Sequence, residues 1–325
     1  MQNFKVLPYK PSNKTEWNKF VLESNQQTFL FQRDFMDYHS DRFKDYSLMI
    51  YKNDELIGLL PANKVNNEVH SHQGLTYGGF VYDASTKSEL VIDMFRETLS
   101  FLNQNGIDSL SIKELPYIFL NNPTNNPFSY ICFKTSAKLY RMDMHSVLDL
   151  KFLNYSRSRK NGYKRGKKNN LVVEETNDFK AFWDDILIPN LDKKHDVKPV
   201  HTLEEIQLLK LRFPKQIRQF NVYKDSKIVA GTTIFETDNV THSQYISGNA
   251  DKNTLGSLDF LHHYLLEEVF GDKPYFNFGI SNIQEGQKVN EGLLYWKEGF
   301  GARSITQGFY RINTENYKLL ETVFV

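Results

Sequence analysis

Residues 222–248 read VYKDSKIVAGTTIFETDNVTHSQYISG, and residues 50–79 read IYKNDELIGLLPANKVNNEVHSHQGLTYGG. Each stretch begins with an apolar residue, Tyr-Lys and a polar turn, and then runs through an apolar strand that contains a glycine. A second polar turn leads to a His-Ser pair, at His242 and at His70, and each stretch ends at a glycine. Apolar runs between Asx-containing turns are typical of β-hairpins. The shared order predicts a fold that is duplicated within the chain.

The residues that follow each repeat extend the duplication. Apolar residues recur at helical spacing after each repeat, and a short apolar strand comes next. The expected helices cover residues 90–103 and 257–270, and the expected strands cover residues 109–112 and 275–278. We therefore expect an α/β (α+β) fold with two domains, residues 1–145 and 146–325, each with a mixed, mostly antiparallel sheet flanked by helices.

Two further helices are expected in the second half. Thr202-Leu-Glu-Glu205 is a capping box, which predicts a helix that ends before Pro214. Residues 286–299 are expected to form another helix, because Asn290, Leu293 and Lys297 recur at helical spacing.

The overall charge excludes one class of protein. The 325 residues include 40 Lys and Arg and 39 Asp and Glu, so the net charge is +1. This balance argues against general nucleic-acid binding, and no DNA partner is expected. One local exception is residues 156–168, SRSRKNGYKRGKK, which contain no acid. This run either contacts phosphate or forms a solvated helix face.

Metal sites, disulfides and membrane spans are not expected. Cys132 is the single cysteine and is expected to be a buried core thiol. His195 and His201 flank Pro199, but no third ligand has a recognisable zinc spacing. The N-terminus has no long apolar segment, and no stretch approaches ~18 uninterrupted apolar residues. We expect a cytoplasmic protein.

The most specific marks lie in the second half. They are the basic run, the strand HSQYISG, the helix start LGSLDFL, the strand YFNFGIS and the closing segment NEGLLYWKEGFGARSITQGFYRI. With these marks the chain resembles the GNAT superfamily of N-acyltransferases, in the branch with two tandem copies of the fold. That branch includes the Fem-type enzymes, which add amino acids to cell-wall precursors. The resemblance covers nearly the whole chain and implies two GNAT-like domains with the active site in the second.

The resemblance also implies an activity. The expected reaction moves an acyl group from acyl-CoA, or a similar donor, to an amine of a sugar-nucleotide, lipid or cell-wall precursor. One alternative is transfer from aminoacyl-tRNA, as in Fem-type enzymes, with the basic run contacting the tRNA. Another is a catalytically silent ligand-binding protein, because a fold does not fix a function.

The donor site departs from the usual pattern. Acetyl-CoA enzymes carry a Gly-rich turn before the main helix, and its amides hold the pyrophosphate. Here the segment reads Asp251-Lys-Asn-Thr-Leu-Gly-Ser257. We expect the donor between the strands that end at Gly248 and Phe278, with free amides at the helix start facing its phosphates. The expected donor-binding residues are Gly248, Gly256, Ser257, Ser281 and Asn282.

His242 is an expected catalytic residue, because the usual pKa of His suits a proton acceptor for an amine. Strand alternation should place Gln244 on the same face. The alternative is a hydrogen-bonded core His, which the matching His70 supports. The residues expected to bind the acceptor are His201, Lys198, Gln244, Tyr245, Asn290 and Glu291.

Lys297 is the other expected catalytic residue. It follows Trp296 and precedes a Gly-flanked turn. In Fem-type enzymes an aromatic-Lys pair at this place stabilises charge near the transferred carbonyl, so the resemblance implies this role for Lys297. The alternative is an exposed Lys paired with Glu298 or Glu291.

Overall fold

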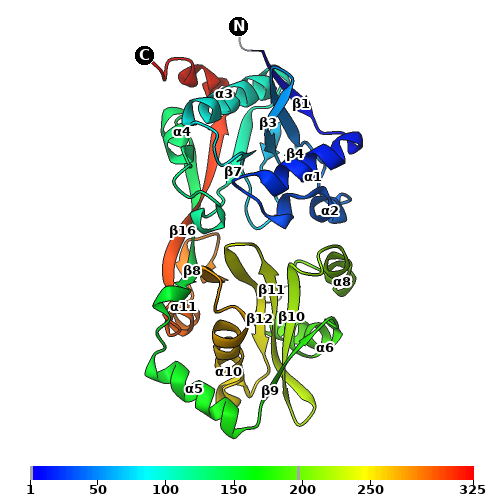
Figure 1. Ribbon diagram of the computed structural model, residues 1–325, viewed down its shortest axis with the longest axis vertical. Helices are drawn as coiled ribbons and strands as arrows, with labels where there is room; N and C mark the ends of the chain where they lie inside the picture. Colours follow the sequence, from blue (N-terminus) through cyan, green and yellow to red (C-terminus); the bar gives the residue numbers. More distant parts are fainter. Residues whose placement is uncertain (1–2, 196–197) are drawn as a thin grey trace. The chain divides into compact units, whose positions relative to one another are not determined.

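The computed structural model describes residues 3–195 and 198–325, which form two compact units (Figure 1). One unit comprises Met1–Asp143, Glu285–Gln287 and Thr306–Val325, and the other comprises Met144–Gln284 and Lys288–Ile305. The expectation that residues 146–325 form one continuous domain is therefore wrong at the C-terminus, where the last 20 residues belong to the first unit.

Two long strands explain this division. Strand β8 (Lys138–Asp149) begins in the first unit, and its last residues pair with β13 (Tyr275–Ile280) in the second. Strand β16 (Arg303–Asn313) begins in the second unit, and its last residues pair with β7 (Ser109–Lys113) in the first. Each unit thus completes its sheet with a strand that the chain enters from the other unit.

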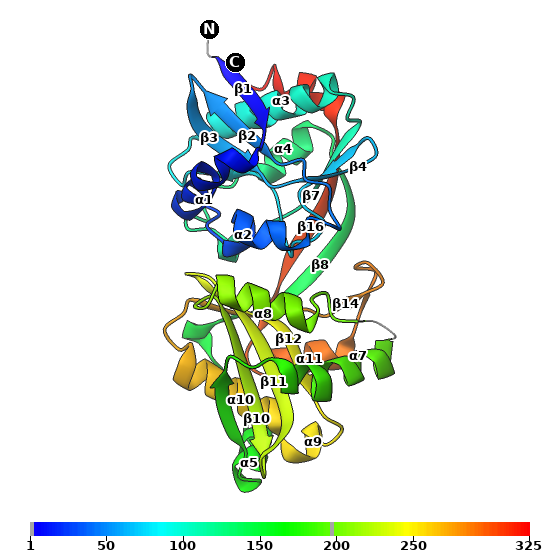
Figure 2. The ribbon, with the colours of Figure 1, turned by 90° about the vertical axis from the view of Figure 1, so that its right-hand side faces the viewer.

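The second unit has the strand order β8-β13-β12-β11-β10-β9. Neighbouring strands are antiparallel, except that β12 and β13 are parallel. Helices α5 and α10 lie on one side of the central strands, and α6 and α8 lie on the other (Figures 1 and 2). The remaining bounds are β9 (Val172–Thr176), β10 (Ile217–Lys224), β11 (Lys227–Glu236), β12 (Val240–Gly248), α5 (Arg157–Lys168), α6 (Lys180–Phe182), α7 (Ile188–His195), α8 (Leu203–Arg212), α9 (Lys252–Leu255), α10 (Ser257–Tyr264) and α11 (Glu291–Glu298).

The first unit has two sheets, ordered β1-β2-β3-β6 and β4-β5-β7-β16. Helices α3 and α4 lie on one side of these strands, and α1 and α2 lie on the other (Figure 1). The bounds are β1 (Phe4–Pro8), β2 (Leu48–Lys52), β3 (Glu55–Leu60), β4 (Asn63–Val65), β5 (Glu68–His70), β6 (Val81–Tyr82), α1 (Lys14–Glu23), α2 (Arg33–Met36), α3 (Ser88–Gln104) and α4 (Phe128–Lys134).

The duplicated order is visible in the strand register. The β2–β3 and β10–β11 hairpins both turn through two residues with positive φ, at 53–54 and at 225–226. Both hairpins have a bulge at the same place, after Ile50 and after Val222. In both units a parallel pair follows, with His70 opposite Ser111 and His242 opposite Asn277.

The two copies nevertheless differ, so strand-for-strand equivalence holds only in part. In the first unit β3 ends before Pro61, which has no N–H for a sheet hydrogen bond, whereas β11 continues unbroken. The counterpart of β12 is divided into β5 and β6, with residues 71–80 between them. The register makes Tyr82, and not Gly79, the counterpart of Gly248.

The helix predictions had mixed success. Both hydrogen bonds of the capping box between Thr202 and Glu205 are present, which confirms the start of α8. The expected helix over residues 286–299 is wrong in its first part, because α11 begins at Glu291. The preceding residues form a hairpin of β14 (Asn282–Ile283) and β15 (Lys288–Val289), and its turn has positive φ at residues 284–286.

Cys132 is buried within the core of the first unit, as expected. No helix among the described residues is long and apolar enough to cross a membrane.

Candidate functional site

Two features of the second unit define the candidate site: the place where its two parallel strands separate, after three residue pairs, and a cavity lined by β12 and several helices. β12 and β13 pair only from Val240 to His242. Beyond that point β13 has an irregular register toward β8 and a left-handed glycine, Gly279, with φ of 72°. A cavity of about 730 Å³ lies in this unit, with walls from β12, α5, α7, α9, α10 and α11. Its lining residues are Ser158, Arg159, Arg165, Asn190, Leu191, Ile246, Ser247, Gly248, Lys252, Asn253, Leu258, Asp259, Asn290, Gly292, Leu293 and Trp296.

A buried carboxylate joins three of these walls. Asp259 Oδ1 accepts a hydrogen bond from Arg159 Nη1 at 2.6 Å and another from Trp296 Nε1 at 2.9 Å. A Cβ at Gly162 would lie 1.6 Å from Asp259 Oδ2, so only glycine lets α5 approach this closely. Burial raises the pKa of Asp259, although the Arg159 guanidinium acts in the opposite direction. Asp259 therefore ties α5 and α11 to the start of α10.

Lys297 is buried at the point where the two strands separate. Only 2% of it is exposed, and Nζ donates to the carbonyl oxygens of Gly279 at 2.9 Å and Ile280 at 2.7 Å. Burial lowers the pKa of Lys297 to about 7. Among the described residues no carboxylate pairs with it, so the alternative of an exposed, ion-paired Lys is wrong.

His242 lies beside this lysine. A Cβ at Gly279 would be 3.5 Å from His242 Cε1, and Lys297 donates to the carbonyl of that glycine. Within the described part of the chain, His242 Nδ1 is buried and has no hydrogen-bond partner. Burial, with smaller contributions from His145 and Lys297, lowers the pKa of His242 to about 3. The imidazole is thus neutral at physiological pH and is a much weaker base than its ordinary pKa predicts.

A bulge changes which residues accompany His242. Ser243 is opposite Ile234 and Tyr245 is opposite Thr233, so Gln244 is an extra residue in β12. Gln244 keeps its expected place, because its side chain lies close enough to the His242 imidazole to act on the pKa of that group. The extra residue interrupts simple alternation beyond this point and brings Tyr245 onto the same face. His201 joins this face, because its Nδ1 lies 2.7 Å from the Tyr245 hydroxyl.

The expected donor residues are not all brought together. Gly248 lines the cavity. Gly256 and Ser257 do not, because a Cβ at Gly256 would lie 2.2 Å from the carbonyl oxygen of Gly162 in α5, and Ser257 is fully buried. Helix α5 therefore covers the start of α10, where the pyrophosphate was expected. Ser281 is buried, and Asn282 accepts a hydrogen bond from the Met144 amide.

The other expected acceptor residues are divided. Asn290 lines the cavity and caps α11 by accepting from the Leu293 amide at 3.0 Å. Glu291 and Lys198 are exposed and do not line the cavity. The side chain of His195 lies outside the described residues. Among those described, no group of three or more His, Cys, Asp or Glu side chains could hold a metal ion.

Sequence reasoning did not assign Lys252 or Asp259 to the site, and it considered Arg159 and Arg165 only as part of the basic run that could contact phosphate. One available signal was the spacing of Gly162 and Gly166 within the basic run. Glycines four residues apart lie on one helix face and permit close packing, here against Asp259 and Phe260. The run therefore has a packed face as well as a solvated one.

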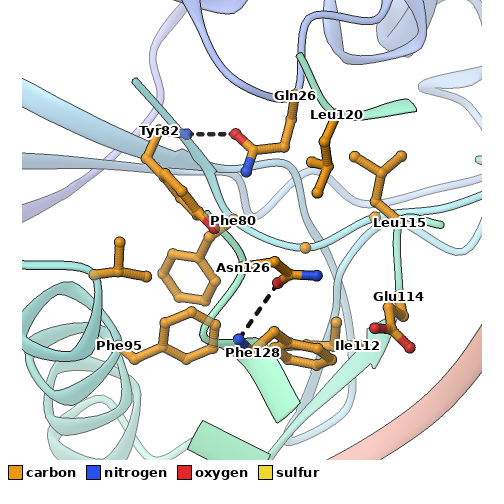
Figure 3. A pocket seen from close by; sticks show the side chains of 13 residues that line it. Gln26, Phe80, Tyr82, Phe95, Ile112, Glu114, Leu115, Leu120, Asn126 and Phe128 are labelled. Carbon is orange, nitrogen blue, oxygen red and sulfur yellow. Dashed lines mark hydrogen bonds between the residues drawn. The ribbon is translucent and has the colours of Figure 1, made fainter. Parts of the chain in front are cut away.

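The corresponding region of the first unit is nearly closed. Its cavity holds about 40 Å³, and Figure 3 shows Phe80, Phe95 and Phe128 in its lining. The rings of Phe80 and Phe95 are stacked with centroids 3.9 Å apart. Such a space suits a water molecule or two but no substrate.

In the first unit the position equivalent to Lys297 is not a lysine. In each unit a residue with positive φ follows the helix: Ser136 follows α4, and Gly301 follows α11. Each of these residues lies the same number of positions before the next strand, so the two helices can be aligned. In this alignment Cys132 takes the place of Lys297. Burial, together with the nearby Glu114 charge, raises the pKa of Cys132 to about 12, so its thiol stays protonated.

Comparison with known proteins supports the fold described above. No protein-family model matches the sequence, and neither does any curated protein. Among solved structures, FemX is similar with a TM-score of 0.67 at 10% identity, covering 98% of this chain and 100% of FemX. L-PGS from Bacillus licheniformis is similar with a TM-score of 0.59 at 12% identity, covering 96% of this chain and 94% of the other. A tandem GNAT protein from the clavulanic acid biosynthesis pathway has a TM-score of 0.50 at 12% identity, with 96% and 99% covered. The chain therefore has the tandem GNAT-like α/β fold that these proteins share.

Proposed function

We propose that the second unit transfers an acyl group from an activated carrier to an amine. The observation that carries this proposal is the buried Lys297, whose ammonium is held by two backbone carbonyls at the separation of β12 and β13. An ammonium has three N–H donors, and two are used. We propose that the third donates to the carbonyl oxygen of the donor. Lys297 does not itself line the cavity, but Trp296, the residue before it in α11, does.

The chemistry requires stabilisation of one developing charge. The amine nitrogen attacks the carbonyl carbon, the new C–N bond forms, and the oxygen gains negative charge. A charged donor in a site with little water stabilises this oxyanion strongly. The bond from carbon to the sulfur or oxygen of the carrier then breaks, and the proton lost by the amine ends on that leaving group.

His242 has a different role from the one its residue type indicates. Its low pKa makes it a poor acceptor for a full proton. The unpartnered Nδ1 can instead accept a hydrogen bond from the attacking amine and orient it toward the carbonyl. His201 and Tyr245, on the same face, are proposed to border the acceptor.

An acyl-CoA or similar small carrier is the leading donor. FemX and the tandem GNAT protein support transferase chemistry only through their fold. Transfer from aminoacyl-tRNA is the second candidate, and the exposed basic residues of α5 favour it. A catalytically silent binding protein would need neither Lys297 nor His242.

The test is a donor screen followed by one substitution. Acyl-CoA esters and aminoacyl-tRNA are assayed for thermal stabilisation of the protein, and transfer to a panel of amines is measured with the donor that stabilises it. Lys297→Met should lower turnover by about 100- to 1,000-fold, the usual effect of losing an oxyanion donor. Cys132→Ser in the first unit is the matched control and should leave turnover unchanged. Full activity of Lys297→Met would refute the proposal.

A further inference from the structure

The backbone that holds Lys297 has an unusual conformation for a strand. Gly279 lies within β13, yet its φ of 72° is in the left-handed region. Pairing with β12 ends at Asn277, so β12 does not stabilise the backbone beyond that residue. The turn at Gly279 directs its carbonyl oxygen and that of Ile280 to the Lys297 ammonium, at 2.9 and 2.7 Å. The conformation of this short segment therefore decides where the ammonium lies.

The side chain of Asn277 stabilises this conformation. Asn277 is fully buried, and its Oδ1 accepts a hydrogen bond from the Gly279 amide at 2.8 Å. Asparagine side chains often accept from the backbone amide two residues ahead, which mimics a backbone turn. The bond thus favours the left-handed conformation at Gly279 at the point where the pairing with β12 ends.

A second buried side chain fixes the orientation of the Asn277 amide. Because Oδ1 accepts from Gly279, the Nδ2 group is the one that faces His145 on β8, and it donates to Nδ1 of that ring at 3.2 Å. Nδ1 of His145 is then an acceptor, so this imidazole carries its proton on Nε2. A continuous set of hydrogen bonds therefore leads from His145 through Asn277 and Gly279 to Lys297.

The duplicated fold offers an internal comparison for this arrangement. The parallel strand pairs of the two units align Asn277 with Ser111, and two residues later they align Gly279 with Lys113. Lys113 lies in strand β7, and its φ is not positive. The asparagine, the left-handed glycine and the lysine of the helix therefore occur together in one copy, and all three are replaced in the other.

Building on the proposed transferase function, we propose that Asn277 is a positioning residue, which fixes the backbone at Gly279 and thereby holds the Lys297 ammonium beside the reacting carbonyl. In this role Asn277 does not touch the substrate, and it acts through the two backbone carbonyls that accept from Lys297. His145 supports Asn277 by holding its amide in the required orientation.

The first part of the test measures turnover. Asn277→Ala should lower it by about ten-fold or more with donor affinity little changed, because a small misplacement of a catalytic group is costly. In Asn277→Ser the hydroxyl can still accept from the Gly279 amide, so most of the rate should return. Asn221→Ala is the matched control, since Asn221 is also buried in this sheet and bonds only within its own strand, β10. Turnover per folded protein should stay native in this control.

The second part measures the protonation of Lys297, which a merely structural role of Asn277 would not alter. The pKa of Lys297, about 7 in the native protein, is obtained from urea unfolding at several pH values, with and without Lys297→Met. It should fall by about half a pH unit or more in Asn277→Ala, because a carbonyl that accepts from the ammonium favours the charged form. His242 and His262, whose pKa values Lys297 helps to lower to about 3 and about 4, are neutral at pH 6 to 9.

Three results would overturn the proposal: native turnover in Asn277→Ala, an equal loss in Asn221→Ala, or an unchanged pKa of Lys297 in Asn277→Ala. If Asn277→Ala does not fold, Gly279→Ala strains the same turn. Its added Cβ would lie 3.5 Å from the nearest atom, and native turnover in that variant would equally overturn the proposal. Native turnover in Lys297→Met would refute the proposed function instead, and the protonation measurement would stand apart from it.

Discussion

Replacing Lys297 by Met should stabilise the second unit at low pH and progressively less at high pH. Burial lowers the pKa of this lysine from 10.5 to about 7, so the unfolded chain binds its proton more tightly than the folded chain does. Stability of the native protein therefore rises with pH between about 7 and 10.5. At pH 6 the buried charge costs on the order of 5 kcal/mol, from about 1.36 kcal/mol for each pKa unit.

The change in stability with pH is the more precise test, because the packing of the Met side chain contributes equally at every pH and therefore cancels. From pH 6 to pH 9 the folded chain loses the proton from Lys297 while the unfolded chain keeps it. The free energy of unfolding of the native protein should rise by about 2.7 kcal/mol relative to Lys297→Met over this range. In Lys297→Met the carbonyl oxygens of Gly279 and Ile280 lose their donor, which offsets part of the stabilisation. This loss is similar at every pH, so it does not change the pH dependence.

The assay is urea unfolding of both proteins at several pH values, followed by a signal from the second unit. Lys164→Met, an exposed lysine on α5, is the control and should show a pH-independent difference from the native protein. A difference for Lys297→Met that does not change between pH 6 and pH 9 would show that the ammonium is not held in a desolvated site.

The remaining predictions concern the groups around this lysine. Asp259→Ala leaves Arg159 buried without its partner and should lower the free energy of unfolding by about 3–5 kcal/mol in urea titrations, with a smaller loss for Asp259→Asn. Gly162→Ala places a Cβ against Asp259 and should cost about 1–3 kcal/mol, whereas Asn161→Ala, one residue away and exposed, should have little effect on melting. His242→Ala should lower turnover, but activity should still fall as the pH rises through about 7. That fall is assigned to deprotonation of Lys297, whereas the pKa of His242 is about 3. If the fall disappears from the pH–rate profile of His242→Ala, it belongs to His242 and not to Lys297.

Local sequence patterns predicted the repeating parts of the fold well. The hairpin turns at 53–54 and 225–226 and the capping box at Thr202 depend on a few adjacent residues, so their geometry can be inferred from residue type. The division of the first sheet near Pro61 and the crossing of β8 and β16 between units could not be inferred, because they depend on long-range pairing.

Some residues of the candidate site could be predicted from the sequence, but their arrangement could not. Lys297 was singled out by the family resemblance and by its place after Trp296, and the structure shows that it is buried. Its catalytic role stays a prediction. Gln244 lies beside His242 as expected, but the bulge at Gln244 moves Tyr245 and the later side chains of β12 to the other face, because one extra residue reverses the alternation beyond it. The cover of α5 over Gly256 was also hidden, because it depends on packing between segments about 90 residues apart.

The central claim is that Lys297 stabilises the carbonyl oxygen during acyl transfer in the second unit. Its most direct test is the single-turnover rate of Lys297→Met with a saturating donor, compared with the native protein and with Cys132→Ser at the corresponding place in the first unit. A fall of about 100- to 1,000-fold in Lys297→Met alone, with donor affinity unchanged, is the result expected for a lost oxyanion donor. Near-normal turnover in Lys297→Met, or an equal loss in Cys132→Ser, would contradict the account.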